Sequence, residues 1–469
     1  MTAATDARPG LANALARRIC EMSYATLPEE TRYWARAGIL DTIGVTVAGS
    51  REAAPRLAAE ALDLHDGPAL ILGRRRRVDL LEAAVVNGTA SHVLDFDDSS
   101  NTMGGHPSAI LTGALLPLAD MLGSPGSDVV AAYVAGFEVQ SKIGLGVNFH
   151  HYSKGWHPTS TLGAFGAAAA ASRLMGLDEA ETAVALAIAA SFASGLKANF
   201  GTMTKPLHVG HCVRNGLYAA RLAAKGFTAN AGSVFEHGQG FLDVFNGKSN
   251  YDMAPTLSTW ARPYDLTSPG IAVKQYPCCG STHPAIDATL AIFRAHRPDP
   301  ARIARIDAAI HARRLTHVNR PHPQSPLDAK FSVQYVISRA IADGRVAVGD
   351  FHDGALEDDR IRALLPKVHM SAYNETGVGD FSADNHFGGH VTITMEDGSK
   401  LSARVEQPEG RTTANPMPQS RLRAKFALCV EGLLQDDRIG PIADMVEHLE
   451  ALPDMGELTE TIRNATLSD

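Results

Sequence analysis

The sequence has few cysteines, and they are not arranged for cross-linking or for zinc. Five cysteines occur in 469 residues, at positions 20, 212, 278, 279 and 429. An odd number of scattered cysteines argues against a fold held by a disulfide framework. No C-x-x-C pair is present, which removes the usual signature of a structural zinc site.

Long apolar runs are also missing. No uninterrupted stretch of 18 apolar residues occurs, and the N-terminus lacks the basic and apolar segments of a secretory signal. The net charge of −8 is modest and gives no reason to expect nucleic acid or a membrane surface as a partner. The one basic run, Arg74–Arg77, is interpreted as an exposed turn. We therefore expect a cytoplasmic protein with neither nucleic acid nor a membrane as a partner.

Several motifs of common enzyme classes are absent as well. The sequence has no G-x-G-x-x-G loop after a strand and no G-x-x-x-x-G-K-[ST] phosphate loop, so a nucleotide cofactor has no support. A G-x-S-x-G nucleophile elbow is also lacking. With 45% apolar and 20% charged residues, the composition is that of an ordinary globular protein.

What the sequence does contain is a succession of amphipathic and alanine-rich helical patterns. Helices are predicted over residues 11–22, 28–48, 80–94, 109–122, 127–148, 157–172, 176–197 and 211–225. Short connections marked by glycine and proline join them. This pattern indicates a helical bundle of about 270 residues.

The pattern changes after Ser268-Pro269-Gly270. Residues 303–312 could form a strand, and residues 390–405 alternate around a Glu-Asp-Gly-Ser turn as a β-hairpin does. Helices are predicted between them, over residues 284–296 and 329–343. These segments indicate an α+β module.

The helical pattern returns near the C-terminus, where Ser420 is a suitable N-cap. We therefore expect a mainly α protein with a large all-helical bundle domain formed by both chain ends. Residues 1–268 and 408–469 would form this domain, and residues 269–407 would form a smaller inserted α+β lid domain.

One polar stretch, residues 91–108, interrupts two apolar helical sequences. It carries Asp95, Asp97 and Asp98, and then His106 before a proline. A turn between two buried helices places such side chains at a cleft formed by helix ends. Capping of a turn is enough to explain Asp97 and Asp98, whereas Asp95 ends an apolar run and could hold a catalytic proton together with His106. Magnesium binding is the weaker alternative, because a histidine and lysines accompany the acids.

Two further motifs supply histidine and lysine at predicted helix starts. His157 opens an Ala/Gly-rich helix, where a helix N-terminus favours anions and lowers the pKa of a nearby base. A structural histidine at a turn is the alternative. Lys205 precedes a proline in a Gly/Thr-rich loop and could hold a substrate carboxylate or donate a proton. His208 and His211 have the spacing of metal ligands on one helix face, but no acidic residue accompanies them.

The fourth motif, residues 273–284, contains Lys274, Cys278 and Cys279 at the start of the predicted lid. Adjacent cysteines rarely pair, and the spacing fixes no partner that would activate a thiol, so thiol chemistry is the weaker interpretation. Together the four motifs supply acids, histidines and two lysines. This set suits a small anionic substrate, with lysines for its carboxylates and a base for a proton beside one of them.

Six motifs in a fixed order carry a resemblance to a known family. They are N-G-T-A-S-H-V-L-D-F-D-D (87–98), G-G-H-P-S (104–108), G-W-H-P-T-S-T-L-G (155–163), T-K-P-L-H-V-G-H (204–211), V-K-Q-Y-P-C-C (273–279) and H-V-N-R-P (317–321). In combination they resemble the MmgE/PrpD family, which includes 2-methylcitrate dehydratases, cis-aconitate decarboxylases and iminodisuccinate epimerase. The resemblance implies a helical domain with an α+β lid, a homodimer, and catalysis without a cofactor, and no metal ligands are assigned.

The same resemblance carries site residues over by motif. Those that match the active site of the decarboxylase branch are Asp95, Ser99, His106, His157, Lys205 and Lys274. His317 and Cys279 depart from it, because that branch has tyrosine and histidine at these two positions. Ser99 replaces a threonine, and the loop to His106 is one residue longer. The stretches around His157, Lys205 and Cys279 look most like those of the epimerase.

We expect a cofactor-independent enzyme that abstracts a proton next to a carboxylate of a small di- or tricarboxylate. The preferred interpretation is an iminodisuccinate-type epimerase. Such a proton is weakly acidic, so the site needs a positioned base and cations that stabilise the enolate-like charge. The alternatives are a lyase of the same family (a 2-methylcitrate-type dehydratase or a cis-aconitate-type decarboxylase) and a non-catalytic carboxylate-binding protein. The candidate catalytic residues are His157, Asp95, Lys205 and His106. The candidate substrate-binding residues are Lys274, Ser99, Thr204, Tyr276, Cys279 and His317.

Overall fold

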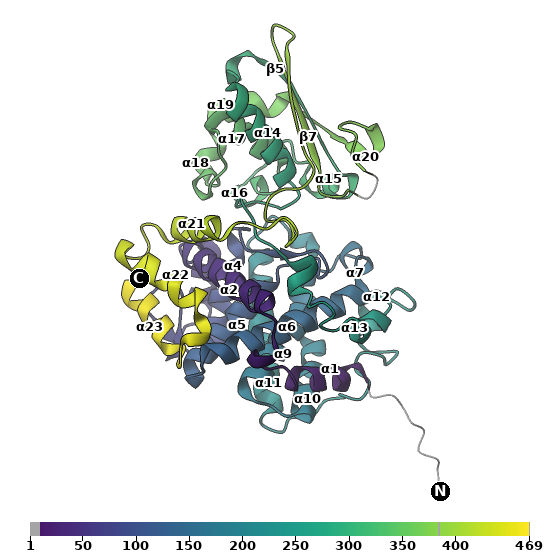
Figure 1. Cartoon of the computed structure of the whole chain (residues 1–469), viewed down its shortest axis with the longest axis vertical. Coiled ribbons are helices and arrows are strands. Elements are labelled where there is room, and N and C mark those ends of the chain that lie inside the picture. Colours follow the sequence, from purple (N-terminus) through teal and green to yellow (C-terminus); the bar gives the residue numbers. More distant parts are fainter. Residues whose placement is uncertain (1–9, 383–384, 469) are drawn as a thin grey trace.

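The computed structural model describes residues 10–382 and 385–468. Helices dominate it, and they gather in a large part from which a smaller part with a β-sheet projects (Figure 1). The mainly α fold expected from the sequence is therefore confirmed. None of the helices in the described residues combines the length and the apolar character that a membrane-spanning helix needs.

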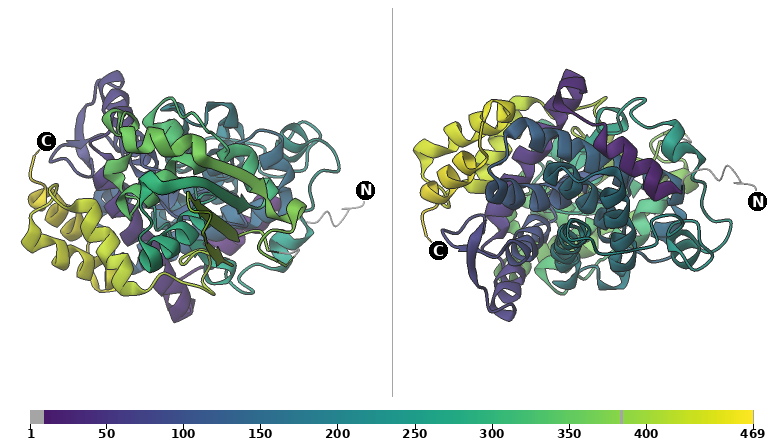
Figure 2. Two further views of the ribbon diagram at one scale, coloured as in Figure 1. Left: turned by 90° about the horizontal axis from the view of Figure 1, so that it is seen from above. Right: turned by 90° about the horizontal axis from the view of Figure 1, so that it is seen from below.

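The large part, called the helical part below, contains helices from both ends of the chain. Its first helices are α1 (Leu11–Cys20), α2 (Glu29–Gly49), α3 (Ala53–Ala61), α4 (Leu80–Val93), α5 (Pro107–Leu122), α6 (Gly126–Val147), α7 (His150–Ser153), α8 (Pro158–Thr161), α9 (Gly163–Met175), α10 (Glu179–Phe192), α11 (Thr204–Ala223), α12 (Phe241–Asn246) and α13 (Ala254–Ser258). Its last helices are α21 (Gln419–Val430), α22 (Asp436–Glu447) and α23 (Gly456–Ala465). These last helices pack against α2 and α5, and Figure 2 shows them flanking the N-terminal helices in both views.

Small residues let the helices of this part pack closely. Helix α9 carries five consecutive alanines, residues 167–171, and all of them are buried. A Cβ added to Gly216 of α11 would lie only 2.3 Å from the Cβ of Ala167. The two helices therefore meet through glycine and alanine, which explains the alanine-rich sequence pattern.

The smaller part, called the α+β part below, is built on a four-stranded sheet in the order β6–β5–β7–β8. Its strands are β5 (Ile303–Ile310), β6 (Val368–Ala372), β7 (Gly389–Met395) and β8 (Lys400–Val405). β5 is parallel to β6 and antiparallel to β7, and β7 and β8 form the hairpin that the sequence predicts.

Two helices, α14 (His283–His296) and α17 (Val333–Asp343), pack on one face of this sheet. The shorter helices of the α+β part are α15 (Ala312–Val318), α16 (Pro326–Ala329), α18 (Asp353–Leu356), α19 (Asp359–Leu364) and α20 (Tyr373–Thr376). Ile292 of α14 and Ile337 of α17 belong to the same apolar cluster as Ile306 and Val391 of the central strands. Seen from above, the sheet lies across the top of the helical part (Figure 2).

The apolar cores of the two parts use different segments of the chain. The main core of the helical part takes its buried residues from Leu11 to Val273 and again from Met417 to Ala465. The two clusters of the α+β part take theirs between Tyr276 and Ile393. An inserted domain would produce this arrangement of cores, and the insertion and its boundaries at 268/269 and 407/408 stay a prediction.

A short ribbon joins the two parts beside the polar stretch that follows α4. β3 (Ser99–Ser100) pairs antiparallel with β4 (Ile271–Ala272), with Ser99 opposite Ala272. The pairing brings Ser99 close to the segment that carries Lys274, although the two residues are far apart in the sequence.

The structure differs from the predicted elements in the region of the basic run. Residues 66–78 form a small hairpin of β1 (Asp66–Leu70) and β2 (Arg77–Val78), which the sequence interpretation did not include. Strands this short leave no periodic pattern to detect. Arg75 and Arg76 in its turn are exposed, as expected, but Arg77 forms an ion pair of 2.5 Å with Asp120.

Several helix boundaries also differ. Helix α11 begins at Thr204, seven residues before the predicted start at residue 211, so Lys205 lies in its first turn and not in a loop. The helix predicted over residues 157–172 is divided into α8 and α9, which meet at Leu162. Helix α21 has Pro418 at its N-cap, not Ser420, and no side chain caps it. Proline has a fixed φ that suits the start of a helix, which explains the earlier beginning.

Candidate active site

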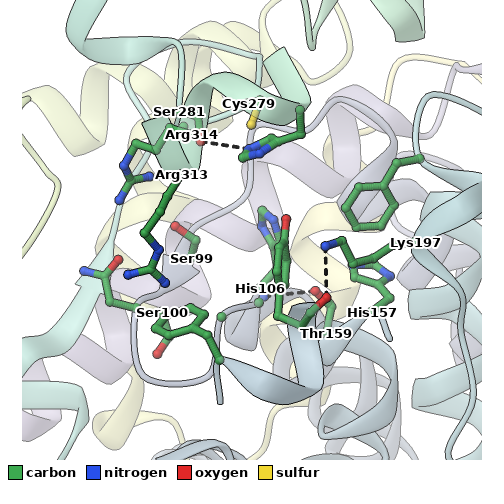
Figure 3. A pocket seen from close by; sticks show the side chains of 18 of the residues that line it. Ser99, Ser100, His106, His157, Thr159, Lys197, Cys279, Ser281, Arg313 and Arg314 are labelled. Carbon is green, nitrogen blue, oxygen red and sulfur yellow. Dashed lines mark hydrogen bonds between the residues drawn. The ribbon is translucent and has the colours of Figure 1, made fainter. Parts of the chain in front are cut away.

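A cavity of about 590 Å³ lies where the helical part meets the α+β part (Figure 3). Its size is that of a small-molecule site. Eight of the predicted site residues line it: Asp95, Ser99, His106, His157, Lys205, Lys274, Cys279 and His317. The fold thus gathers in one place residues that the sequence separates by more than two hundred positions.

Two predicted residues do not line this cavity. Thr204 is the exposed first residue of α11, whereas the side chain of its neighbour Lys205 reaches the cavity. Tyr276 is buried in the α+β core, where its hydroxyl donates a 2.5 Å hydrogen bond to Asp287. Thr204 stands next to a motif lysine and Tyr276 stands two residues beyond another, but closeness in the sequence does not bring a side chain to the same cavity.

Asp95 lies just beyond the C-terminus of α4 in a left-handed conformation, with a φ of 52°. A residue other than glycine in this region costs about 1–3 kcal/mol and needs surrounding contacts to hold it. The Asp95 amide donates to the carbonyl of His92 at 3.1 Å, which closes the turn. The turn ends the helix and brings Asp95 to the cavity wall.

Three buried lysines hold three successive carbonyl groups of this turn. The hydrogen bonds run from Lys330 Nζ to Leu94 O (2.8 Å), from Lys274 Nζ to Asp95 O (2.7 Å) and from Lys425 Nζ to Phe96 O (2.8 Å). Carbonyl groups at the end of a helix carry the negative end of its dipole, so ammonium groups are stabilising there. Lys330 lies in the α+β part and Lys425 in α21. The turn that carries Asp95 is therefore held by elements that the local sequence does not contain.

The side chain of Asp95 lies between two ammonium groups. Oδ1 is 2.5 Å from Lys205 Nζ and Oδ2 is 3.0 Å from Lys274 Nζ, and none of the three side chains is more than 7% exposed. Burial by itself would raise the pKa of Asp95, but the two lysines outweigh it and hold this pKa well below its usual range. Burial lowers the pKa of Lys274, and the Asp95 charge outweighs this effect and raises it. In this environment Asp95 is a carboxylate that positions the two lysines. It is not suited to carry a catalytic proton.

Behind His106, Asp97 is shared by two histidines. Its Oδ2 lies 2.9 Å from Nδ1 of His92 and 3.2 Å from Nδ1 of His106. Burial lowers the pKa of His92 to about 3, so this ring is neutral. Burial raises the pKa of Asp97, but the neighbouring imidazoles outweigh it and keep this pKa well below its usual range. The carboxylate thus orients the His106 ring that lines the cavity, a role beyond the turn cap expected for Asp97.

The sequence interpretation expects Asp98 to cap the turn that follows it, but Asp98 bonds to the start of α5 instead. Its carboxyl group accepts hydrogen bonds from the Ser108 amide at 3.2 Å and from the Ser108 hydroxyl, at the start of α5. Burial raises the pKa of Asp98 to about 8. Asp98 is not among the residues that line the cavity.

The cluster of His92, Asp97 and His106 also has the composition of a metal site, with candidate ligand atoms within 4.8 Å of one another. Nδ1 of His92, however, lies at hydrogen-bond distance from Asp97, and a metal would have to displace the proton between them. The charge of Lys205 also acts against a further cation, since it contributes to lowering the pKa of His92. The arrangement fits a hydrogen-bonded relay better than a metal centre.

His157 is the N-cap residue of α8, as its position before a proline predicts. Its Nδ1 lies 3.1 Å from Nδ1 of His208, and its ring stacks on that of His92 with centroids 5.8 Å apart. Burial, then the nearby His92 and Lys205, lower the pKa of His157 well below its usual range. A neutral imidazole beside the cavity is suited to accept a proton.

Cys279 and His317 lie on the α+β side of the cavity. His317 Nε2 is 3.0 Å from Ser281 Oγ, and Figure 3 shows Cys279 and Ser281 above His106. Burial raises the pKa of Cys279, but the hydrogen bond from His317 and its charge outweigh this and lower it to about 7. The fold therefore supplies the activating partner that the sequence spacing could not show.

Among the described residues that line the cavity, six side chains are cationic and one is a carboxylate, so the charge of the wall is mainly positive. The cations that the sequence interpretation missed are Lys197, Arg313, Arg314 and Arg411. Lys197 Nζ lies 3.3 Å from the centroid of the Tyr152 ring, and burial lowers its pKa to about 8. No sequence motif marks these four residues, because each lies in an ordinary helical or loop sequence. They come together at one site only because the two parts pack against each other.

Comparison with known protein families explains this combination of fold and site. A model of the MmgE/PrpD N-terminal domain matches residues 13–254, and a model of the MmgE/PrpD C-terminal domain matches residues 276–451. The chain belongs to the MmgE/PrpD family. The resemblance carried by the six sequence motifs is therefore confirmed.

Named relatives narrow the chemistry of this MmgE/PrpD enzyme. The chain is 32% identical to the cis-aconitate decarboxylase of Mus musculus over 411 residues, which cover 82% of this chain and 79% of that protein. It is 30% identical to the cis-aconitate decarboxylase of Homo sapiens over 441 residues, or 91% and 89% of the two chains. It is 24% identical to the 2-methylcitrate dehydratase of Salmonella typhimurium over 392 residues, or 77% of each chain. These relatives indicate a lyase and give no support to the preference for an epimerase.

Proposed function

We propose that this enzyme is a cofactor-independent lyase that acts next to a carboxylate of a small di- or tricarboxylate of the cis-aconitate or 2-methylcitrate type. The observation that carries the proposal is the composition of the cavity wall. Six cationic side chains and, among the residues that the structure describes, one carboxylate line the cavity together with His106 and His157. Cations recognise the carboxylates of such a substrate and stabilise the negative charge that develops during the reaction.

The geometry suggests how the charge and the proton are handled. Breaking a C–H or a C–CO₂⁻ bond leaves an electron pair on carbon, which delocalises into a neighbouring carboxylate. Lys205 and Lys274, held by Asp95, stabilise this enolate-like charge. In dehydration, the neutral His157 accepts the proton from carbon, and His106 donates a proton to the departing hydroxide. In decarboxylation, His106 donates the proton that takes the place of carbon dioxide.

Epimerisation of an iminodisuccinate-type dicarboxylate is the second candidate, and one feature favours it. Cys279 has a pKa of about 7 beside His317, on a different wall from His157. A second acid on another wall could return a proton to the opposite face of the same carbanion.

The homodimer implied by the family resemblance and the cytoplasmic location expected from the sequence stay predictions, and light scattering tests the first.

Incubation with each acid in deuterated water tests the proposal. Release of carbon dioxide from cis-aconitate or new alkene absorbance from 2-methylcitrate identifies the lyase. Deuterium entering iminodisuccinate without net product identifies the epimerase instead.

Lys205→Met should lower kcat/KM by about 100-fold or more. The matched control Thr204→Ala, at the neighbouring exposed position outside the cavity, should leave it unchanged. Turnover of none of the three acids would refute the proposal, and so would a Lys205→Met variant as active as the wild type.

A further inference from the structure

One histidine that does not line the cavity contacts the candidate base. His208 lies on α11, one turn beyond Lys205, and is half-buried. Its Nδ1 atom lies 3.1 Å from Nδ1 of His157, which is within hydrogen-bond distance. The spacing of His208 and His211 is that of metal ligands on one helix face, but the structure pairs His208 with His157 instead.

Aromatic neighbours hold the His157 ring in one orientation. The His92 ring stacks on it with centroids 5.8 Å apart, and the Phe200 ring meets it edge to face with centroids 4.9 Å apart. In Figure 3, His157 and Lys197 lie on the same side of His106 at the cavity. Packing of this kind leaves the imidazole little freedom to turn, so each ring nitrogen has a defined surrounding.

The contact between the two histidines decides which nitrogen of His157 faces the cavity. Nδ1 is engaged by His208, which is not among the residues that line the cavity, so Nε2 is the nitrogen that remains for a ligand. Of two neutral imidazoles that share a hydrogen bond, one donates and the other accepts.

The surroundings of the two rings indicate that His157 is the donor. The charge of Lys205 lowers the pKa of His157, and beside an ammonium group a lone pair on Nε2 is favoured over an N–H group. His208 is half-buried, so its own Nε2–H can bond to water. His157 therefore donates from Nδ1, and His208 accepts.

We propose that His208 is the positioning residue of His157, which accepts the Nδ1 proton of His157 and keeps Nε2 of His157 free as the proton acceptor in the cavity. The inference rests on the proposed function, in which His157 takes a proton from carbon. In that step the C–H bond breaks, its electron pair stays on carbon, and an Nε2–H bond forms. The hydrogen bond to His208 then becomes charge-assisted, which stabilises the imidazolium ion.

The two histidines of the cavity have different partners, and the difference suits them to different roles. Asp97 lies 3.2 Å from Nδ1 of His106, and its negative charge favours a protonated ring. Within residues 10–382 and 385–468, no carboxylate oxygen lies within 4.0 Å of a ring nitrogen of His157 or His208. Burial lowers the pKa of His208 to about 4, so this partner is neutral. A neutral partner orients His157 without fixing a proton on it, so His157 suits the base and His106 the acid.

Other groups around the pair also oppose a positive charge on it. Those that face it from α4, α11 and the residue before α5 are His92, Lys205, His211 and His106. Each of them lowers the pKa of His157 or of His208. A carboxylate in the place of the His208 ring would act in the opposite direction and make His157 hold its proton.

NMR spectra of protein with labelled histidine ring nitrogens test the tautomer without using activity. His157→Gln identifies the signals of His157. The wild type should carry a proton on Nδ1 of His157 and none on Nε2, whereas an isolated neutral imidazole prefers the reverse. His208→Asn should keep this tautomer, because its amide oxygen can accept in the place of Nδ1, and His208→Phe should lose it. A wild-type His157 protonated on Nε2 would overturn the inference.

Kinetics with 2-methylcitrate give a second test. His208→Phe should lower kcat by about tenfold or more with little change in KM, and His208→Asn should restore most of this loss. His208→Asp should move the acidic limb of the kcat profile upward by about one pH unit or more, because the new carboxylate raises the pKa of His157. His211→Asn, at an exposed position one turn further along α11, is the matched control and should behave as the wild type.

The outcomes separate this inference from the proposed function. It is refuted if His208→Phe keeps the wild-type kcat, or if His208→Asp leaves the pH profile unchanged. If His208→Phe does not fold by circular dichroism, the other variants and the wild-type spectra carry the test. Turnover by an enzyme whose His157 is protonated on Nε2 would refute the inference and leave the proposed function standing. The expected tautomer, together with no turnover of any acid, would refute the proposed function and leave the placement of His208 standing.

Discussion

Replacing Asp95 by asparagine tests the charge cluster at the centre of the cavity wall. Asp95→Asn keeps the shape of the side chain and removes the charge between Lys205 and Lys274, which lie 2.5 and 3.0 Å from it. Two buried ammonium groups then have no counter-ion, and breaking a buried pair in this way costs about 3–5 kcal/mol. Deprotonating one lysine at pH 7 costs about 5 kcal/mol, which sets the upper limit. We therefore expect the free energy of unfolding to fall by about 3–5 kcal/mol.

Urea unfolding followed by tryptophan fluorescence measures this loss, because Trp34, Trp156 and Trp260 all lie in the helical part. Glu60→Gln is the matched control. It breaks an exposed ion pair with Arg56, of 2.7 Å, and should cost less than about 1 kcal/mol.

The pH dependence gives a second check on the same variant. Because the folded protein depresses the pKa of Asp95, its contribution is complete above the unfolded value of about 3.9 and is lost as the pH falls through the folded pKa. The difference between Asp95→Asn and the wild type should therefore shrink below about pH 4. A loss below about 1 kcal/mol at pH 7, or an equal loss at pH 3 and pH 7, would show that the reasoning is wrong.

Three further predictions follow from the other residues of the site. Iodoacetamide should alkylate Cys279 at a rate that rises around pH 7, since the pKa of this thiol is about 7. The adjacent Cys278 should react much more slowly, because burial raises its pKa to about 12. Equal labelling of both cysteines in mass spectra would contradict this prediction. Asp97→Asn should lower kcat by about 100-fold and alter its pH profile, because an amide cannot orient His106 as the carboxylate does; an unchanged profile would count against the relay. Tyr276→Phe should lower the free energy of unfolding by about 1–2 kcal/mol and leave KM unchanged, because the hydroxyl bonds within the α+β core; a large rise in KM would place it at the substrate.

Much of the fold could be predicted because helical periodicity is a local property. The apolar repeats gave the α4 and α5 helices on either side of the polar stretch, and strict alternation gave the β7–β8 hairpin. The small β1–β2 hairpin was missed, since a two-residue strand has no period of its own.

The sequence by itself also determined two of the helix ends at the cavity, although it placed the start of α11 seven residues too late. His157 precedes a proline at a helix start, and Asp95 follows the last apolar residue of a helix, so both were identifiable locally. The sequence did not determine the directions of side chains. Thr204 does not line the cavity that the neighbouring Lys205 reaches.

Only the tertiary structure decided which charges meet. The lysines that hold the Asp95 turn, Lys330 and Lys425, come from separate segments, and no local pattern connects either of them to it. The arginines Arg314 and Arg411 line the same cavity as Lys205 only because the α+β part packs on the helical part. Burial and partners set a pKa or the free energy of a charge, and both depend on contacts between segments that are remote in the chain. The sequence therefore determined the chemical groups of this enzyme, and the packing of its two parts determined their charge states and their partners.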